Sequence, residues 1–471
     1  MVFSSAAFLF AFLPLFMGIY FLLRSRRSRN VWLFAASIFF YAWGEPVYVA
    51  LMLASVTVNW FFALRIAAAP RRKKSMLAAA CIFNVLVIGF FKYQGFLARS
   101  CNALFGANIV PDLQLPLPIG ISFYTLQALS YVIDVYRGQV APQRNILNLG
   151  MYIACFPQLI AGPIVRYQTI AEQILQRNEN LEDFTSGLRL FIVGLAKKIL
   201  LADTVAILAS AMLKRGGADI GLVGAWGGLL AYTFQIYFDF SGYSDMAIGL
   251  GRMLGFRYLP NFNYPYISTS VTEFWRRWHI SLSSFFRDYL YIPLGGNRVG
   301  RARWVMNIAI VWATTGLWHG AAWNFVLWGL YYCALLLLEK LVYGQWLTKL
   351  PRVLQHAYTA FAFMLGWLIF WIDSPTKFGS YLYALFGGYG LTGASTFWEI
   401  QVWSYIPIFA LCAVAATPVL PLVKKERASA LPQRGNSLRA ASCDVALIAL
   451  LVLCACSVAA SRFSPFLYFR F

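Results

Sequence analysis

Charged side chains are scarce in this chain. Only 12% of its 471 residues are Asp, Glu, Lys or Arg, against about 25% in soluble domains, while 60% are hydrophobic. Several runs hold about 18 or more mostly apolar residues, enough to cross a hydrocarbon core about 30 Å thick as a helix. Membrane-spanning strands would be shorter and would alternate in polarity. The scarcity of charge therefore excludes an ordinary soluble protein and predicts an all-α polytopic membrane protein.

Metal-binding and soluble-enzyme motifs are also missing. The eight cysteines include no CxxC pair, and no Cys/His cluster has the spacing of a zinc site. The sequence contains no P-loop, no GxSxG elbow and no HExxH motif. We therefore expect no metal site and no tightly bound cofactor, and we interpret the cysteines as small buried hydrophobic side chains.

The charge that is present is strongly positive, with a net value of +21. Basic residues collect in short loops between apolar runs, such as 24–29 and 70–74, which is typical of cytoplasmic loops. This pattern favours anionic lipid headgroups, and not nucleic acid, as the opposing surface. The first apolar run precedes its basic residues, which is the reverse of a cleaved signal. We expect a retained first helix with an external N-terminus.

The alternation of charged loops predicts about eleven or twelve crossings, with both termini on the external, periplasmic side. We see no internal repeat and no soluble domain, so the sequence predicts one membrane domain over 1–471. Its parts would be N-terminal helices in 1–92, a core that carries the motifs in 117–340, and C-terminal helices in 353–471.

Two segments do not fit a simple crossing. Prolines and a glycine interrupt the apolar run 146–165, which indicates a re-entrant segment packed inside protein. The segment 256–303 is too polar to span but is dense in aromatic residues and arginines. This composition is typical of an interfacial segment at the cytoplasmic face.

His319 is one of only three histidines and lies in 304–338, which holds no charged residue. As one helix these residues would be about 52 Å long, too long for one crossing without extreme tilt. Gly316 and Gly320 flank the histidine, so we expect a helix break there. An ionisable group inside a membrane is a functional candidate, here a general base toward a hydroxyl. The alternatives are a core histidine bonded to a neighbouring helix, or glycines that serve only close packing.

His279 lies in "RRWHISLSSFFRDYLYIPLGGNR". On a single helix, Arg276 and Ser283 would fall near its face. One interpretation is an interfacial amphipathic helix with Arg and Trp at the headgroups. The other is a pocket for a polyanionic donor whose phosphates the arginines match, with backbone N–H groups from the turn "PLGGN". The candidate donor-binding or tunnel residues in this stretch are Arg276, Arg277, Trp278 and Asn297.

Two carboxylates, Asp239 and Asp245, interrupt the apolar run "QIYFDFSGYSDMAIGLG". Each costs about 2.5 kcal/mol or more at the membrane centre unless it is paired or hydrated. They could pair with a cation such as Arg252 or Lys197. Alternatively they line a polar tunnel together with Tyr243.

Four stretches resemble the membrane-bound O-acyltransferase (MBOAT) family, in the bacterial branch that acetylates exported polysaccharides of the alginate and cellulose type. These are the histidine stretch quoted above, "TTGLWHGAAWNFVLWG", "YFDFSGYSDMAIGLG" and the closing "FSPFLYFRF". The resemblance runs along the whole chain. It implies a ring of about eleven tilted helices, with re-entrant and interfacial helices, around a central tunnel.

The resemblance also implies a site and its substrates. The family histidine of the "WHG" context corresponds to His319, the proposed catalytic residue, and a second position, His or Asn, corresponds to His279. Trp318 and Asn324 complete the candidate tunnel or donor-binding set. Acetyl-CoA would be the donor substrate. The partner would be a periplasmic SGNH-type acetyltransferase of a polysaccharide complex at the bacterial inner membrane.

Three other functions stay open, the first and the third from the residues and the second as a relative that the resemblance implies. A transporter or flippase could move an acyl group or glycan without bond chemistry, since broken helices and buried polar residues fit it too. A D-alanyl-transferring relative would use a carrier-protein thioester as donor. A structural scaffold for polysaccharide export would make both histidines replaceable. The polysaccharide and the immediate acceptor, a sugar hydroxyl or a partner serine, are likewise open.

Overall fold

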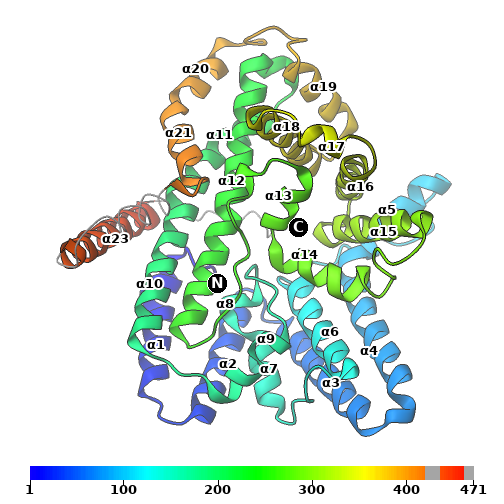
Figure 1. Ribbon diagram of the computed structural model, residues 1–471, viewed down its shortest axis with the longest axis vertical. Coiled ribbons are helices and arrows are strands. Elements are labelled where there is room, and N and C mark those ends of the chain that lie inside the picture. Colours follow the sequence, from blue (N-terminus) through cyan, green and yellow to red (C-terminus); the bar gives the residue numbers. More distant parts are fainter. Residues whose placement is uncertain (420–434, 461–471) are drawn as a thin grey trace. The chain divides into compact units, whose positions relative to one another are not determined.

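The computed structural model describes residues 1–419 and 435–460, which form helices and loops without a strand (Figure 1). The closing motif 463–471 lies outside the described residues. Six described helices are long and apolar enough to cross a membrane: Val49–Ala68, Pro70–Phe105, Gly217–Met253, Trp323–Leu347, Arg352–Trp371 and Ser442–Ala460. A bent pair, Thr396–Ser404 with Ile406–Ala415, is a seventh candidate. The all-α multi-pass class is confirmed, and the larger number of crossings stays a prediction.

The chain folds into two compact units, and the first holds Met1–Phe191 and Tyr243–Leu259. A single functional domain over 1–471 stays a prediction. The helices that begin in this unit are η1 (Ala7–Phe12), α1 (Leu13–Leu22), α2 (Arg26–Ala42), α3 (Val49–Ala68), η2 (Pro70–Arg72), α4 (Lys73–Ile88), η3 (Gly89–Tyr93), α5 (Gln94–Phe105), α6 (Ile121–Arg137), α7 (Ile146–Ala154), α8 (Phe156–Leu159), α9 (Tyr167–Gln176) and α10 (Leu181–Ala196).

The second unit holds Ile192–Gly242 and the described residues from Pro260 onward. Its helices are η4 (Lys197–Ala202), α11 (Asp203–Leu213), η5 (Pro265–Ile267), α13 (Val271–Arg277), α14 (Ile280–Phe286), η6 (Arg287–Tyr291), α15 (Arg301–His319), α16 (Trp323–Leu338), η7 (Glu339–Tyr343), α17 (Gly344–Leu347), α18 (Arg352–Trp371), α19 (Pro375–Leu385), α20 (Thr396–Ser404), α21 (Ile406–Ala415) and α23 (Gly435–Ala460). The long helix α12 (Gly217–Met253) begins in this unit and ends in the first.

The interrupted run 146–165 is broken in the first unit as its prolines predicted. α7 ends at Ala154, and α8 is a single turn with Pro157 near its start. Every residue from Asn148 to Val165 is buried. Irregular backbone in a membrane protein must be buried inside protein, because lipid cannot form hydrogen bonds with exposed peptide groups. The break is confirmed, and a re-entrant depth stays a prediction.

A partly buried cluster of ionised side chains stabilises the first unit. The Glu179 carboxylate accepts a hydrogen bond from Tyr20 at 2.6 Å, pairs with Arg26, and pairs with Arg29 at 2.9 Å. Arg177 donates to the Tyr20 hydroxyl at 2.9 Å and to the Leu254 carbonyl at 3.0 Å. Burial alone would raise the pKa of Glu179, but the bonds from Arg26 and Tyr20 lower it to about 2. The cluster therefore joins α1, α2 and the loop after α9 through one carboxylate.

Candidate active site

His319 is the last residue of α15, and a break follows it at once. Gly320 is extended (φ −168°, ψ 155°), and α16 begins at Trp323. The break predicted from length is confirmed. Gly316 also serves close packing, because a Cβ there would lie 2.3 Å from the Phe325 carbonyl oxygen. The glycine thus allows a close approach of α15 and α16, and the functional role of His319 stays a prediction.

Aromatic rings surround the imidazole of His319, which is only 5% exposed. Its ring centroid lies 4.9 Å from Trp328, 5.0 Å from Trp318 and 5.4 Å from Phe370. The Asn324 amide donates to the Phe370 carbonyl at 2.9 Å. Asn324 therefore fastens α16 to the end of α18 beside the histidine.

His279 lies at a second break, between α13 and α14. Its backbone is left-handed (φ 44°, ψ 55°), a conformation that non-glycine residues adopt rarely and that often marks a functional site. The prediction of one helix through this stretch is wrong, so Arg276 and Ser283 do not share a helix face with it. The reason is tertiary: Asn263 N–H donates to the Arg277 carbonyl, and Ile280 N–H donates to the Asn261 carbonyl, each at 2.9 Å. These bonds replace the helical ones.

The side chain of His279 is 1% exposed and meets both polar and aromatic groups. Its Nδ1 lies 3.1 Å from Asn261 Oδ1. Its ring centroid lies 4.7 Å from Phe240 and 5.9 Å from Trp318. Burial lowers the pKa of His279 to about 3, so the ring is neutral at physiological pH.

Trp318 contacts both histidines, at 5.9 Å from His279 and 5.0 Å from His319. The second unit thus brings together residues that lie forty positions apart in the sequence. Trp278 joins the same aromatic group, with its ring 4.8 Å from Trp367. The two histidines and both predicted tryptophans form one cluster, which we call the histidine cluster.

Glu339 supports this cluster from the far end of α16. Its carboxylate accepts hydrogen bonds from Val271 N–H at 2.6 Å and Thr272 N–H at 2.9 Å, and from the Thr272 and Tyr358 hydroxyls. A carboxylate at a helix N-terminus satisfies N–H groups that lack helical partners and favours the helix dipole. Glu339 therefore anchors α13, the helix that leads to His279. No role was assigned to Glu339 from the sequence.

The carboxylate of Asp239 is paired, as one of the two sequence interpretations expected. It lies 2.6 Å from Lys198 Nζ, which also bonds Asp203 at 2.7 Å. Lys198 is the neighbour of the partner that the sequence suggested. Tyr243 stacks on Phe3 at 4.6 Å within the first unit, and Asp245 is half-buried in the same unit. Of these three residues, only Asp239 shares a unit with the histidines.

The predicted donor-binding arginines lie at the edge of the α13–α14 turn. Arg276 and Asn297 are exposed. Arg277 pairs with Glu273 at 2.8 Å and donates to the Asn263 carbonyl at 3.1 Å. Arg277 therefore braces the turn that carries His279. A role of these side chains in binding the donor stays a prediction.

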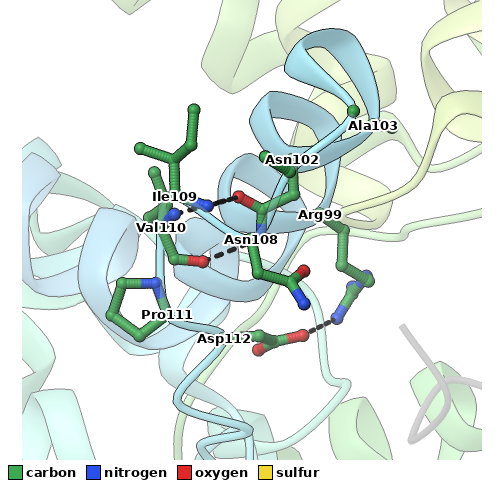
Figure 2. A pocket seen from close by; sticks show the side chains of 10 residues that line it. Arg99, Asn102, Ala103, Asn108, Ile109, Val110, Pro111 and Asp112 are labelled. Atoms are coloured by element: carbon green, nitrogen blue, oxygen red, sulfur yellow. Dashed lines mark hydrogen bonds and ion pairs between the residues drawn. The ribbon is translucent and has the colours of Figure 1, made fainter.

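A surface pocket lies in the first unit at the end of α5, and no histidine lines it (Figure 2). The Asn102 side chain accepts from the N–H groups of Ile109 and Val110 at 2.9 Å, and Arg99 pairs with Asp112 at 2.7 Å. Its polar groups thus bond one another and hold the loop. Within the described residues, no group of three His, Cys, Asp or Glu side chains could hold a metal ion.

The long apolar helices define a multi-pass membrane protein, and comparison with known sequences gives its family. Residues 141–382 match the MBOAT, membrane-bound O-acyltransferase family. Over the full length of both chains, the sequence is 39% identical to the probable alginate O-acetylase AlgI of Azotobacter vinelandii and 38% identical to that of Pseudomonas aeruginosa. It is 35% identical to the peptidoglycan O-acetyltransferase of Helicobacter pylori, over 84% of this chain and 81% of that one. The chain belongs to the MBOAT family and is an O-acyltransferase.

Proposed function

We propose that this protein moves acetyl groups from cytosolic acetyl-CoA across the bacterial inner membrane for the O-acetylation of an exported polysaccharide. The observation that carries the proposal is the histidine cluster, in which Trp318 contacts both His279 and His319. Full-length similarity to proteins named as probable alginate O-acetylases supports acetyl as the acyl group and alginate as the type of polymer.

In the proposed reaction, the imidazole of His319 accepts the proton of the acceptor hydroxyl. The hydroxyl oxygen attacks the thioester carbonyl, so that a C–O bond forms and the C–S bond breaks. The thiolate takes a proton and leaves as the free thiol of CoA. A neutral imidazole suits this step, because general bases work best unprotonated and close to the reacting hydroxyl. His279 holds or positions the donor.

The wider arrangement is part of the same proposal. The helices form a ring of about eleven crossings around a central tunnel, which connects His279 on the donor side with His319 on the acceptor side. Both termini are periplasmic. The acceptor is a sugar hydroxyl or a serine of a periplasmic SGNH-type partner, and the exposed Arg276 and Asn297 face the phosphates of the donor.

The test is the release of free CoA by the purified protein, given labelled acetyl-CoA with the polymer or its partner. We expect His319→Ala to lower transfer by at least about 100-fold at a normal protein level. His356→Gln is the matched control, since this histidine lies 3.1 Å from the Ser268 carbonyl and outside the cluster. Normal transfer by the His319 variant would contradict the base role. Uptake of label without any release of CoA would instead indicate a transporter.

A further inference from the structure

Asn261 presents one side-chain oxygen to three polar atoms of two residues, His279 and Ser281. Its Oδ1 lies 3.2 Å from the Ser281 backbone nitrogen, 2.9 Å from the Ser281 hydroxyl and 3.1 Å from His279 Nδ1. The side chain is 1% exposed. The Ser281 backbone N–H is a fixed donor, and it determines which nitrogen of His279 carries the proton.

The Ser281 backbone N–H can only donate, so the Asn261 atom that faces it must be the amide oxygen and not the amide nitrogen. An amide oxygen can only accept. His279 Nδ1 must therefore carry the proton in this contact. A neutral imidazole has one ring proton, so its Nε2 is a hydrogen-bond acceptor.

The backbone fixes the same pair a second time. Ile280 N–H donates to the Asn261 carbonyl at 2.9 Å, which holds the peptide after His279 against the residue that orients its ring. The left-handed backbone of His279 (φ 44°) aims the side chain back toward this contact. Ring rotation would break the Nδ1 bond inside a buried site, where a lost hydrogen bond costs about 1–3 kcal/mol.

We propose that Asn261 is a positioning residue that holds His279 in the Nδ1–H tautomer, so that Nε2 accepts a hydrogen bond from the acyl donor. The inference rests on the proposed function and narrows the role of His279 within it. An acceptor nitrogen cannot polarise the thioester carbonyl, which needs a donor. It suits an amide N–H on the arm that carries the thioester.

The direct test is nitrogen NMR of the protein in lipid bilayers with ¹⁵N-labelled histidine. The chain has three histidines, and the spectrum of His279→Gln identifies the signals of His279. At pH 7 we expect its Nδ1 in the protonated range and its Nε2 in the unprotonated range. A signal from Nε2–H, or from a doubly protonated ring, would overturn the assignment. This spectrum does not depend on acetyl transfer, so a correct tautomer without CoA release would refute only the proposed function.

Variants of Asn261 connect the tautomer with catalysis. Asn261→Asp keeps an acceptor oxygen, and we expect it to keep the Nδ1–H signal and measurable transfer. Asn261→Leu removes the acceptor, and we expect a changed His279 signal and a transfer rate at least about tenfold lower. Ser284→Ala is the matched control, because its hydroxyl bonds the Ser281 carbonyl within α14.

An Asn261→Leu protein that keeps both the wild-type tautomer and full transfer would contradict the positioning role. An equal loss of transfer in the Asp and Leu variants, with the His279 signal unchanged in both, would indicate that Asn261 has a purely structural role. If the Leu variant does not fold, the wild-type spectrum still decides the tautomer.

Discussion

The two helix breaks of the second unit hold their histidines by different means. At the α13–α14 break, polar contacts from Asn261 fix the backbone and the ring of His279. At the α15–α16 break, close glycine packing and three aromatic rings confine His319. A hydrogen bond to a ring nitrogen selects the tautomer of an imidazole, whereas contacts with neighbouring rings restrict its orientation. Under the proposed function, the break at His279 would serve donor recognition and the break at His319 would serve proton transfer.

The largest effect is expected from a substitution that disrupts the α15–α16 packing around His319. Gly316→Ala places a methyl group 2.3 Å from the Phe325 carbonyl oxygen, which forces α15 and α16 apart. We expect a loss of about 3 kcal/mol in the free energy of unfolding, measured by thermal denaturation in detergent, and a loss of transfer. Gly379→Ala is the control, because its Cβ would meet no atom within 4 Å. Equal stability of the two variants would show that the helices do not need this glycine.

A smaller effect is expected from a substitution of Glu339, which supports the helix leading to His279. Glu339→Gln removes the charge and one acceptor oxygen from the N-terminus of α13, and should lower stability by about 1–2 kcal/mol. Transfer should fall while α15 and α16 keep their packing. Glu172→Gln, at an exposed position of α9, should change neither quantity. A Glu339→Gln enzyme with wild-type melting and transfer would show that α13 does not depend on the Glu339 carboxylate.

The smallest effect concerns the first unit, whose ion cluster contains no histidine. The pKa of Glu179 is lowered from 4.5 to about 2 by Arg26 and Tyr20. Its stabilisation is therefore complete above pH 4.5 and is lost as the pH falls toward 2. We expect a loss of about 1 kcal/mol by pH 4, measured by thermal denaturation. Glu179→Gln should be less stable at pH 7 and should lack this step. If the variant loses stability over this pH range as the wild type does, the loss comes from another carboxylate.

Sequence reasoning succeeded where one local pattern decides the structure. Apolar run lengths predicted the helical membrane class, and length arithmetic predicted the break beside His319. Pairing was one of two interpretations of Asp239, and the structure shows it, although the partner is Lys198 and neither Lys197 nor Arg252.

It failed where distant residues decide. The break at His279 depends on backbone bonds to Asn261 and Asn263, which replace helical bonds in a stretch that otherwise favours a helix. Ser270 caps α13 locally, but the acceptor of its first two N–H groups is Glu339, sixty-eight and sixty-seven positions further along the chain. No local spacing announces such contacts. The roles of the predicted donor-binding residues likewise stay predictions.

The length of α16 determines how Glu339 is placed relative to the break at His319. This helix begins just after the turn that follows His319, and the residue that follows it, Glu339, anchors the helix leading to His279. Each residue of a helix adds about 1.5 Å and about 100° of rotation. One inserted or deleted residue in 323–338 would therefore turn the carboxylate away from α13. Relatives that share this geometry should vary in the side chains of this helix but not in its length.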